Sequence, residues 1–311
     1  HTRSSTVSWL GMCIRDSLII FSAAIKSDNV ERAEAKRRGI PELERSEALG
    51  QLTEGYESVV GIAGCHGKTT ITSMLALICE QGGPDATVHI GGFVDFLNGG
   101  VRLGAHDMFI TEACEYVESF LTLRPTIALI NNIDNDHLDY YGDMEHIVAA
   151  FKKFAALLPE NGLLIGNTDD FRVRALMAEH TGRKLSYGMK DADYTPANIT
   201  YDDNGCPGFD IMFRGEKLMH IQLRIPGEHS VMNAIAAAAV AREIGADNKC
   251  IVSALNAFRN TRRRFEYYGE RNGVKYYHDY GHHPSEIAAT MKAASNVKHN
   301  KLFCVFQCNS Y

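Results

Sequence analysis

The chain has 311 residues, about the length of two domains. With 45% hydrophobic and 23% charged residues it can bury a core, which argues against disorder. Its net charge of −6, with both signs mixed along the chain, argues against a general nucleic-acid binder. No uncharged apolar run reaches the roughly 18 residues that a bilayer span requires, so no membrane segment is expected. Eight cysteines without a C-x-x-C pair are typical of reduced thiols, which predicts a cytoplasmic location.

From Leu18 onward, apolar runs of strand length alternate with helical patterns, which predicts an α/β fold with a mainly parallel sheet. The strands expected in this part are 18–22, which we expect to be buried, 58–63, 108–111, 126–133 and 162–165. The helices expected between them are 29–38, 69–80 and 146–158.

The pattern changes over 194–225, where apolar and polar residues alternate between turn signals at Asp203-Asn204-Gly205 and Arg214-Gly215. This alternation predicts antiparallel hairpins. An Ala-rich helix is expected over 229–244, and a new sheet begins at Phe265. A strand over 274–278 and a helix from Ser285 follow it.

Both ends of the sequence have unusual patterns. Residues 1–17 show neither helical nor strand periodicity, and the sequence leaves open whether they are native. Residues 301–307 (KLFCVFQ) have the pattern of a buried strand, yet the sequence stops four residues later. Because a strand buried on both faces needs cover, we expect a piece of a longer protein, cut at both ends.

The sharpest motif joins the strand 58–63 to the helix 69–80 and reads Gly64-Cys65-His66-Gly67-Lys68-Thr69-Thr70. Glycines let backbone N–H groups curl around phosphate oxygens, and the helix N-terminus directs positive charge toward them. Lys68 suits the β- and γ-phosphates, and the Thr69 hydroxyl suits Mg²⁺. Ile62 occupies the place of the first glycine of the general pattern, so the loop is a compact variant. The motif predicts a nucleotide site.

Polar groups follow three of the expected strands. The first two, 112–115 (EACE) and 134–139 (DNDHLD), should face the crevice of the phosphate loop, since ligands bind beyond the carboxyl ends of parallel strands. Carboxylates and an imidazole there can hold one or two Mg²⁺ ions. The third group, 279–284 (DYGHHP), is equally consistent with a surface cap and with a site for a nucleotide or an acidic substrate.

Together these motifs resemble the Mur ligase family, the ATP-dependent amide ligases of peptidoglycan precursor synthesis. The phosphate loop has the family's form, which accounts for the missing glycine. The other matching segments run in family order and are 22–25 (SAAI), 112–121 (EACEYVESFL), 132–139 (NIDNDHLD), 226–233 (PGEHSVMN), 263–265 (RRF), 279–284 (DYGHHP) and 305–307 (VFQ).

The resemblance implies three domains. Residues 1–55 would be the remnant of an N-terminal domain that holds the UDP-sugar. Residues 56–261 would form the central ATP-binding domain, and residues 262–311 would begin a C-terminal Rossmann-like domain. Within the family the set is most similar to members whose substrates are UDP-N-acetylmuramate and L-alanine.

The resemblance also implies roles for individual residues. The whole motif Gly64-Cys65-His66-Gly67-Lys68-Thr69-Thr70 would bind ATP, and the residues organising Mg²⁺ would be Thr69, Glu112 and His137. Adenine would contact Asn233, with His229 nearby. Those reaching ATP from the third domain would be Arg263 or Arg264 and Asp279. The incoming amino acid would be placed by Tyr280 and His282.

The implied reaction is attack of the muramic carboxylate on the γ-phosphate of ATP, giving an acyl phosphate that the amine of L-alanine then attacks. Because the first step brings anions together, cations must neutralise them, and Lys68, Mg²⁺ and Arg264 supply that charge. The amine must be neutral when it attacks, and His137 or His282 is a candidate base.

Several positions depart from the family pattern. Cys65 replaces the usual Thr, and Cys114 replaces a common acidic residue, which removes one carboxylate near the metal. Nothing before Leu18 matches the family's glycine-rich UDP-binding turn, and the basic residues that hold the alanine carboxylate do not follow Gln307.

Three other functions remain open. One is a ligase that joins murein tripeptide to UDP-N-acetylmuramate. Another is a chain that binds ATP and Mg²⁺ without catalysis. The least favoured is a generic phosphate-loop NTPase that hydrolyses ATP to drive motion.

Overall fold

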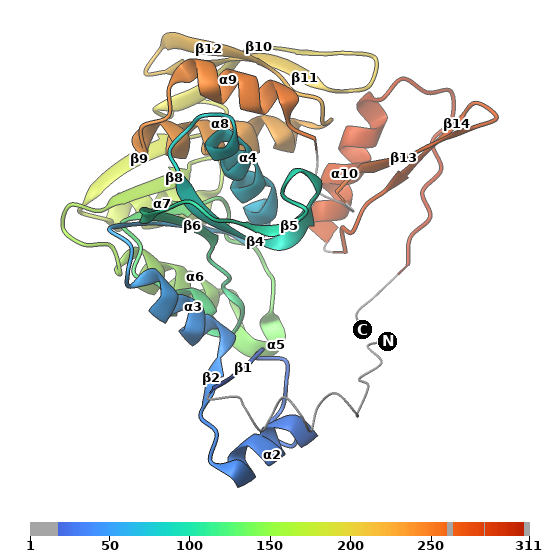
Figure 1. The fold of residues 1–311 in the computed structure, drawn as a ribbon. Helices are drawn as coiled ribbons and strands as arrows, with labels where there is room; N and C mark the ends of the chain where they lie inside the picture. Colours follow the sequence, from blue (N-terminus) through green and yellow to red (C-terminus); the bar gives the residue numbers. More distant parts are fainter. Residues whose placement is uncertain (1–17, 260–263, 283, 308–311) are drawn as a thin grey trace.

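The computed structural model describes residues 18–259, 264–282 and 284–307 (Figure 1). Within these ranges, ten strands form one sheet in the order β12-β11-β10-β9-β8-β7-β3-β6-β4-β5. Its strands are β3 (Ser58–Ala63), β4 (Ala86–Val94), β5 (Gly99–Arg102), β6 (Ala105–Glu112), β7 (Ile127–Ile130), β8 (Leu163–Asn167), β9 (Arg183–Tyr187), β10 (Tyr194–Tyr201), β11 (Pro207–Phe213) and β12 (Glu216–Gln222). The strands from β9 to β4 pair in parallel, which confirms the predicted α/β fold with a mainly parallel sheet.

Helices cover both faces of this sheet (Figure 1). One face packs against α4 (Lys68–Glu80), α8 (Glu228–Glu243) and α9 (Asn248–Ala257), and the other against α6 (Met144–Ala155) and α7 (Phe171–Glu179). Neighbours along β7 alternate between the two cores, with Leu129 on the α4 side and Ile130 on the α6 side. Burial on both faces explains why the sequence of this strand is continuously apolar.

The segment predicted as hairpins forms them. Strand β11 pairs antiparallel with both β10 and β12. The turn between β11 and β12 holds Arg214 and Gly215, both with positive φ, and the turn before β11 contains Gly205 with φ 70°. The backbone twist of such turns suits the strands that they join.

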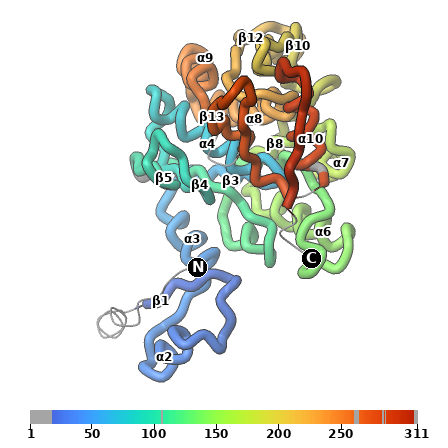
Figure 2. The backbone as a smooth tube through the Cα atoms, turned by 90° about the vertical axis from the view of Figure 1, so that its right-hand side faces the viewer, coloured from blue at the N-terminus to red at the C-terminus, as the bar shows by residue number. Residues whose placement is uncertain are grey.

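The N-terminal part consists of β1 (Ile19–Phe21), α2 (Val30–Arg38), β2 (Glu42–Glu44) and α3 (Arg45–Thr53). The predicted helix 29–38 is confirmed, since the Asn29 side chain caps its N-terminus and Gly39 ends it with φ 68°. The prediction that 18–22 is buried is wrong, because β1 pairs only with β2 in the described residues and Ile20 is 54% exposed. Figure 2 shows this part at the lower end of the molecule.

The C-terminal part is a hairpin of β13 (Glu266–Arg271) and β14 (Val274–His278), followed by α10 (Pro284–Asn296), which contacts α8. The predicted buried strand 301–307 is wrong, because this segment is irregular and exposed, with Val305 99% exposed. A strand needs a neighbour to bond its backbone, and the described hairpin contains only β13 and β14.

Short elements complete the described part of the chain. They are the 3₁₀ turns η1 (Asp95–Leu97) and η2 (Tyr116–Thr122) and the single-turn helix α5 (Leu138–Tyr141). No helix among the described residues combines the length and apolar character of a membrane span.

Phe154 of α6 tests the packing beneath the strand that leads into the phosphate loop. Its fully buried ring stacks on Phe120 with 4.8 Å between centroids, and it lies against Gly61 of β3. Replacing Phe154 with Ala opens a cavity and should lower the free energy of unfolding by about 3–5 kcal/mol. Urea denaturation checks this, with Phe171→Ala (59% exposed) as the control, expected to cost under about 1 kcal/mol. Equal losses from both variants would contradict this account of the core.

Candidate nucleotide site

The phosphate loop connects β3 to α4 through two glycines with left-handed backbone. Gly64 has φ 135° and Gly67 has φ 87°. A Cβ on Gly67 would lie 2.5 Å from Asn131 Nδ2 and 2.7 Å from Asn233 Oδ1. Glycine is therefore needed at this position both for its backbone angle and for space.

Two asparagines at the end of β7 anchor the loop. The backbone N–H of His66 donates to Asn132 Oδ1 at 2.8 Å, and the side-chain amides of Asn131 and Asn132 donate to His66 O at 2.8 and 3.0 Å. The Tyr187 hydroxyl donates to Asn131 Oδ1 at 2.6 Å, which fixes the orientation of that amide. The sequence analysis assigned no role to Asn131 or Asn132, although an amide pair directly after a buried strand was a usable signal.

Cys65 ties the loop to the segment after β7. Its Sγ accepts a hydrogen bond from Asp134 N at 3.1 Å and donates to Asp134 O at 3.4 Å. Burial raises the pKa of this thiol, helped by the charge of Glu115. A protonated thiol can donate and accept as a Thr hydroxyl does, so the loop keeps its shape despite the departure from the family pattern.

Lys68 forms an ion pair with Glu115, at the carboxyl side of β6. Its Nζ lies 2.8 and 3.0 Å from the two carboxylate oxygens, and the Glu115 side chain is 1% exposed. The Lys68 ammonium also donates to Gly64 O at 2.5 Å, inside its own loop. Burial lowers the pKa of Lys68, but the charge of Glu115 outweighs it and the net shift is upward. The lysine is therefore held charged beside the loop.

Thr69 and Glu112 lie together, as the sequence analysis expected for a metal site. The Thr69 hydroxyl donates to Glu112 Oε2 at 3.0 Å, and Gly91 N donates to the other oxygen at 2.7 Å. Burial raises the pKa of Glu112, and these two hydrogen bonds oppose the shift only in part. A cation bound there would favour the ionised carboxylate.

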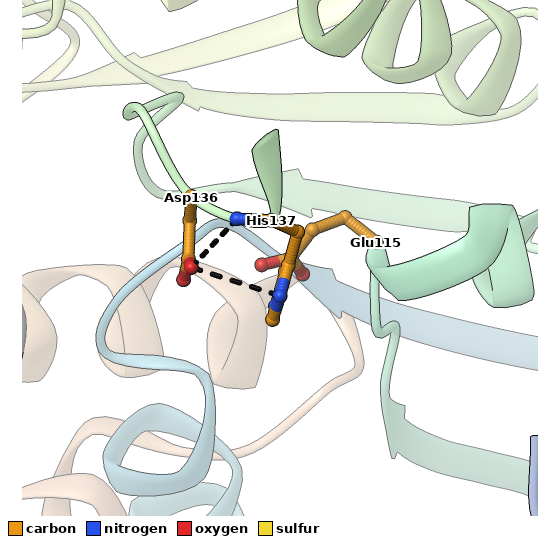
Figure 3. Close-up of side chains that lie close together, drawn as sticks. All are labelled: Glu115, Asp136 and His137. Carbon is orange, nitrogen blue, oxygen red and sulfur yellow. Dashed lines mark hydrogen bonds and ion pairs between the residues drawn. The ribbon is translucent and has the colours of Figure 1, made fainter. Parts of the chain in front are cut away.

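His137 lies with two other groups that carry metal-ligand atoms (Figure 3). One ligand atom from each of Glu115, Asp136 and His137 lies within 4.8 Å of the others. The His137 backbone N–H donates to Asp136 Oδ1 at 2.8 Å, and its ring lies 4.8 Å from the Tyr116 ring. The two carboxylates offer the oxygen ligands that Mg²⁺ prefers, and the imidazole of His137 would add one nitrogen ligand. Metal binding was predicted for the acidic groups 112–115 and 134–139 as a whole, but Glu115 and Asp136 were not among the individual ligands that the resemblance implied.

A pocket of about 260 Å³ lies between the phosphate loop and the C-terminal part. Its lining residues are Cys65, His66, Gly67, Lys68, Thr69, Thr70, Asn131, Asn132, His229, Ser230, Asn233, Arg264, Phe265, Asp279, Glu286, Ala289 and Thr290. Four of the residues expected outside the loop to contact ATP are among them: His229, Asn233, Arg264 and Asp279. Burial lowers the pKa of His229, which favours its neutral form. Arg263 lies outside the described residues.

The three C-terminal candidates differ in their surroundings. Asp279 accepts hydrogen bonds from Phe265 N at 2.7 Å and Gly281 N at 2.6 Å, so its carboxylate shapes the wall of the pocket. Tyr280 is 47% exposed, and its ring lies 5.3 Å from that of His282. Among the described residues, neither Tyr280 nor His282 lines the pocket.

The Lys68–Glu115 pair predicts strongly coupled mutations. Lys68→Met leaves a buried carboxylate without its cation and should lower the free energy of unfolding by about 3–5 kcal/mol. The double variant Lys68→Met/Glu115→Gln should recover most of that loss, because no buried charge is left unpaired. Urea denaturation of the four proteins of this cycle measures the coupling. Losses that simply add would contradict the pairing.

The thiol of Cys65 is predicted to be unreactive in the folded protein. Because burial raises the pKa of Cys65, its thiol should resist alkylation by iodoacetamide at pH 8, whereas the exposed Cys304 should react. Cys65→Ser retains the bonding with Asp134, whereas Cys65→Ala should cost about 1–3 kcal/mol. Peptide mapping by mass spectrometry and denaturation check the two statements. Rapid labelling of Cys65 without denaturant would contradict the predicted resistance to alkylation. Equal stability of the Cys65→Ser and Cys65→Ala variants would contradict the role of the hydrogen bonds with Asp134.

Three protein-family models match this chain. A family model described as the Mur ligase middle domain matches residues 62–241. Models described as the Mur ligase, glutamate ligase domain and as the Mur ligase family, catalytic domain match residues 263–309 and 5–57.

Known relatives and solved structures that resemble this chain are also ligases of this kind. The UDP-N-acetylmuramate–L-alanine ligase of Clostridium beijerinckii is 44% identical over 295 residues, which are 94% of this chain and 64% of the relative. The structure of UDP-N-acetylmuramate-alanine ligase from Thermotoga maritima has a TM-score of 0.78 at 26% identity, covering 90% of this chain and 64% of that one. A murein peptide ligase from Psychrobacter arcticus has a TM-score of 0.74 at 25% identity, covering 92% and 65%.

The chain thus spans less than two thirds of the length of the curated relative. The middle-domain model alone covers more than half of the chain, including the phosphate loop and the acidic groups that follow β6 and β7. This chain belongs to the Mur ligase family.

Proposed function

We propose that this chain carries the ATP-binding part of a ligase that joins L-alanine to the carboxylate of UDP-N-acetylmuramate, in peptidoglycan precursor synthesis. The observation that carries the proposal is the convergence of Lys68, Glu112 and His137 around one phosphate loop. The relative that is 44% identical, a UDP-N-acetylmuramate–L-alanine ligase, supports the choice of substrates.

The proposed division of the chain follows from the family. Residues 1–55 belong to the UDP-sugar domain, residues 56–261 form the ATP-binding domain, and residues 262–311 begin the C-terminal domain. The cytoplasm is the proposed location, and the six described cysteines, all of which are free thiols, support it.

The loop residues 64–70 bind the ATP phosphates, and Asn233 with His229 binds the adenine. Thr69, Glu112 and His137 would hold Mg²⁺, which would supply positive charge to offset that of the phosphates. Lys68 contacts the phosphates from its place in the loop, where its ammonium already donates to Gly64 O while paired with Glu115. Arg264 and Asp279, with Arg263, act from the C-terminal side of the pocket.

In the first step, an oxygen of the muramic carboxylate attacks the γ-phosphorus and ADP leaves, which gives an acyl phosphate. Lys68 and Arg264 lower the barrier by offsetting the negative charge that gathers there. The L-alanine amine then attacks the acyl carbon, and phosphate departs as the amide forms.

Two residues are proposed to hold the amino acid and its proton. Tyr280 and His282 place L-alanine, and the amine loses a proton to His137 or His282. A metal-bound imidazole is a poor base, so a metal role for His137 favours His282 as the base.

Phosphate release tests the function directly. The complete gene product that contains this chain is given Mg-ATP and UDP-N-acetylmuramate with L-alanine, glycine, L-serine or murein tripeptide, and the Clostridium beijerinckii relative serves as the positive control. We expect release that depends on both the sugar and L-alanine and that falls at least about a hundredfold in Lys68→Met. Release with tripeptide alone would favour the murein peptide ligase, a function that the similar fold of the Psychrobacter arcticus enzyme keeps as a candidate. ATP binding without release would leave only a nucleotide-binding chain.

A further inference from the structure

Glu286, in the first turn of α10, joins parts of the chain that lie far apart in sequence. Its carboxylate lies 3.4 Å from His66 Nδ1 in the phosphate loop and 3.1 Å from Arg264 Nη1. It also accepts a hydrogen bond from His282 N at 3.1 Å. The side chain is only 13% exposed, so these contacts are shielded from solvent.

His66 extends this link to the sheet. Its other ring nitrogen, Nε2, lies 3.2 Å from Asp134 Oδ2, in the segment after β7. The series Asp134–His66–Glu286 therefore runs from the sheet through the phosphate loop to α10. The electrostatics of Glu286 agree with this series. Burial alone would raise the pKa of Glu286, whereas His66 and Arg264 hold that pKa well below its usual range.

The link crosses the nucleotide pocket. His66 belongs to the wall formed by the phosphate loop, and Arg264 and Glu286 belong to the opposite wall. A second contact between α10 and the central part, Lys292–Glu228 at 2.8 Å, is exposed and involves no residue that lines the pocket. Glu286 thus contacts residues of both walls, so a movement of one wall can be transmitted to the other.

We propose that Glu286 is a positioning residue that couples the phosphate loop to the C-terminal part through His66 and directs Arg264 toward the bound nucleotide. The proposal rests on the proposed function for its nucleotide, but the contacts of Glu286 with His66 and Arg264 involve only residues of the chain itself. Without the carboxylate, His66 loses its partner on α10, and nucleotide binding must then order the two walls that Glu286 keeps together.

The first test uses the ligand-free chain. Amide hydrogen exchange is followed in peptides that cover residues 64–70 and 284–296 for the wild type, Glu286→Gln and the control Lys292→Gln. Glu286→Gln keeps the shape and removes the charge, and we expect faster exchange in the 64–70 peptide, about tenfold. Lys292→Gln, on the same helix, should leave that peptide unchanged.

The second test measures the affinity for a fluorescent ADP analogue with Mg²⁺. Glu286→Gln should weaken binding by about tenfold, and Lys292→Gln should bind as the wild type does. The double variant His66→Ala/Glu286→Gln should bind only slightly more weakly than either single variant, because both substitutions remove the same contact between His66 and Glu286.

The outcomes separate the coupling from the function. Wild-type protein that binds no nucleotide would overturn the proposed function, while the exchange experiment would still decide the coupling. Unchanged exchange in the 64–70 peptide of Glu286→Gln, or an equal change in Lys292→Gln, would overturn the coupling. Should Glu286→Gln lose its fold, His66→Gln tests the same link from the phosphate loop.

Discussion

The ion pair between Lys68 and Glu115 is the interaction on which the candidate site depends. It joins the first residue of α4 to the segment after β6, with one partner almost completely buried. Taking both charges out of water is costly, and a well-packed apolar pair is often as stable. A polar pair retained at such a place is best explained by a need for the charge. Here the charge lies in the loop where phosphate would bind.

The parallel sheet explains why the other groups gather at the same place. Strands β3, β6 and β7 are neighbours, and their carboxyl ends deliver the phosphate loop, Glu112 with Glu115, and Asn131 through His137. Cys65, Asn131 and Asn132 then lock the loop against the end of β7. The C-terminal part closes the pocket from the other side through Arg264, Asp279 and Glu286.

The sequence predicted the site better than the periphery, for physical reasons. A glycine loop between a strand and a helix has a local signature, and the parallel topology then requires the acidic groups of β6 and β7 to face it. The set of individual metal ligands was incomplete because Glu115 meets Asp136 and His137 only through tertiary packing. Strands β2, β4, β5 and β9 and helices α3, α5, α7 and α9 were not predicted, because their short or mixed sequence patterns do not identify them and tertiary packing stabilises them. At residues 301–307 the error was the reverse: a strand was predicted where the structure has none. An apolar run does not form a strand without a neighbouring strand to pair with.

The most direct test of the account is calorimetric titration of Mg-ADP into two proteins, the wild-type chain and the double variant Lys68→Met/Glu115→Gln. The variant leaves no buried ion unpaired, so a loss of affinity reports on the charged groups of the site and not on folding. We expect the wild type to bind and the variant to bind about tenfold to a hundredfold more weakly. Equal affinity in the two proteins, or no binding by a folded wild type, would contradict the claim that Lys68 is held charged for a nucleotide.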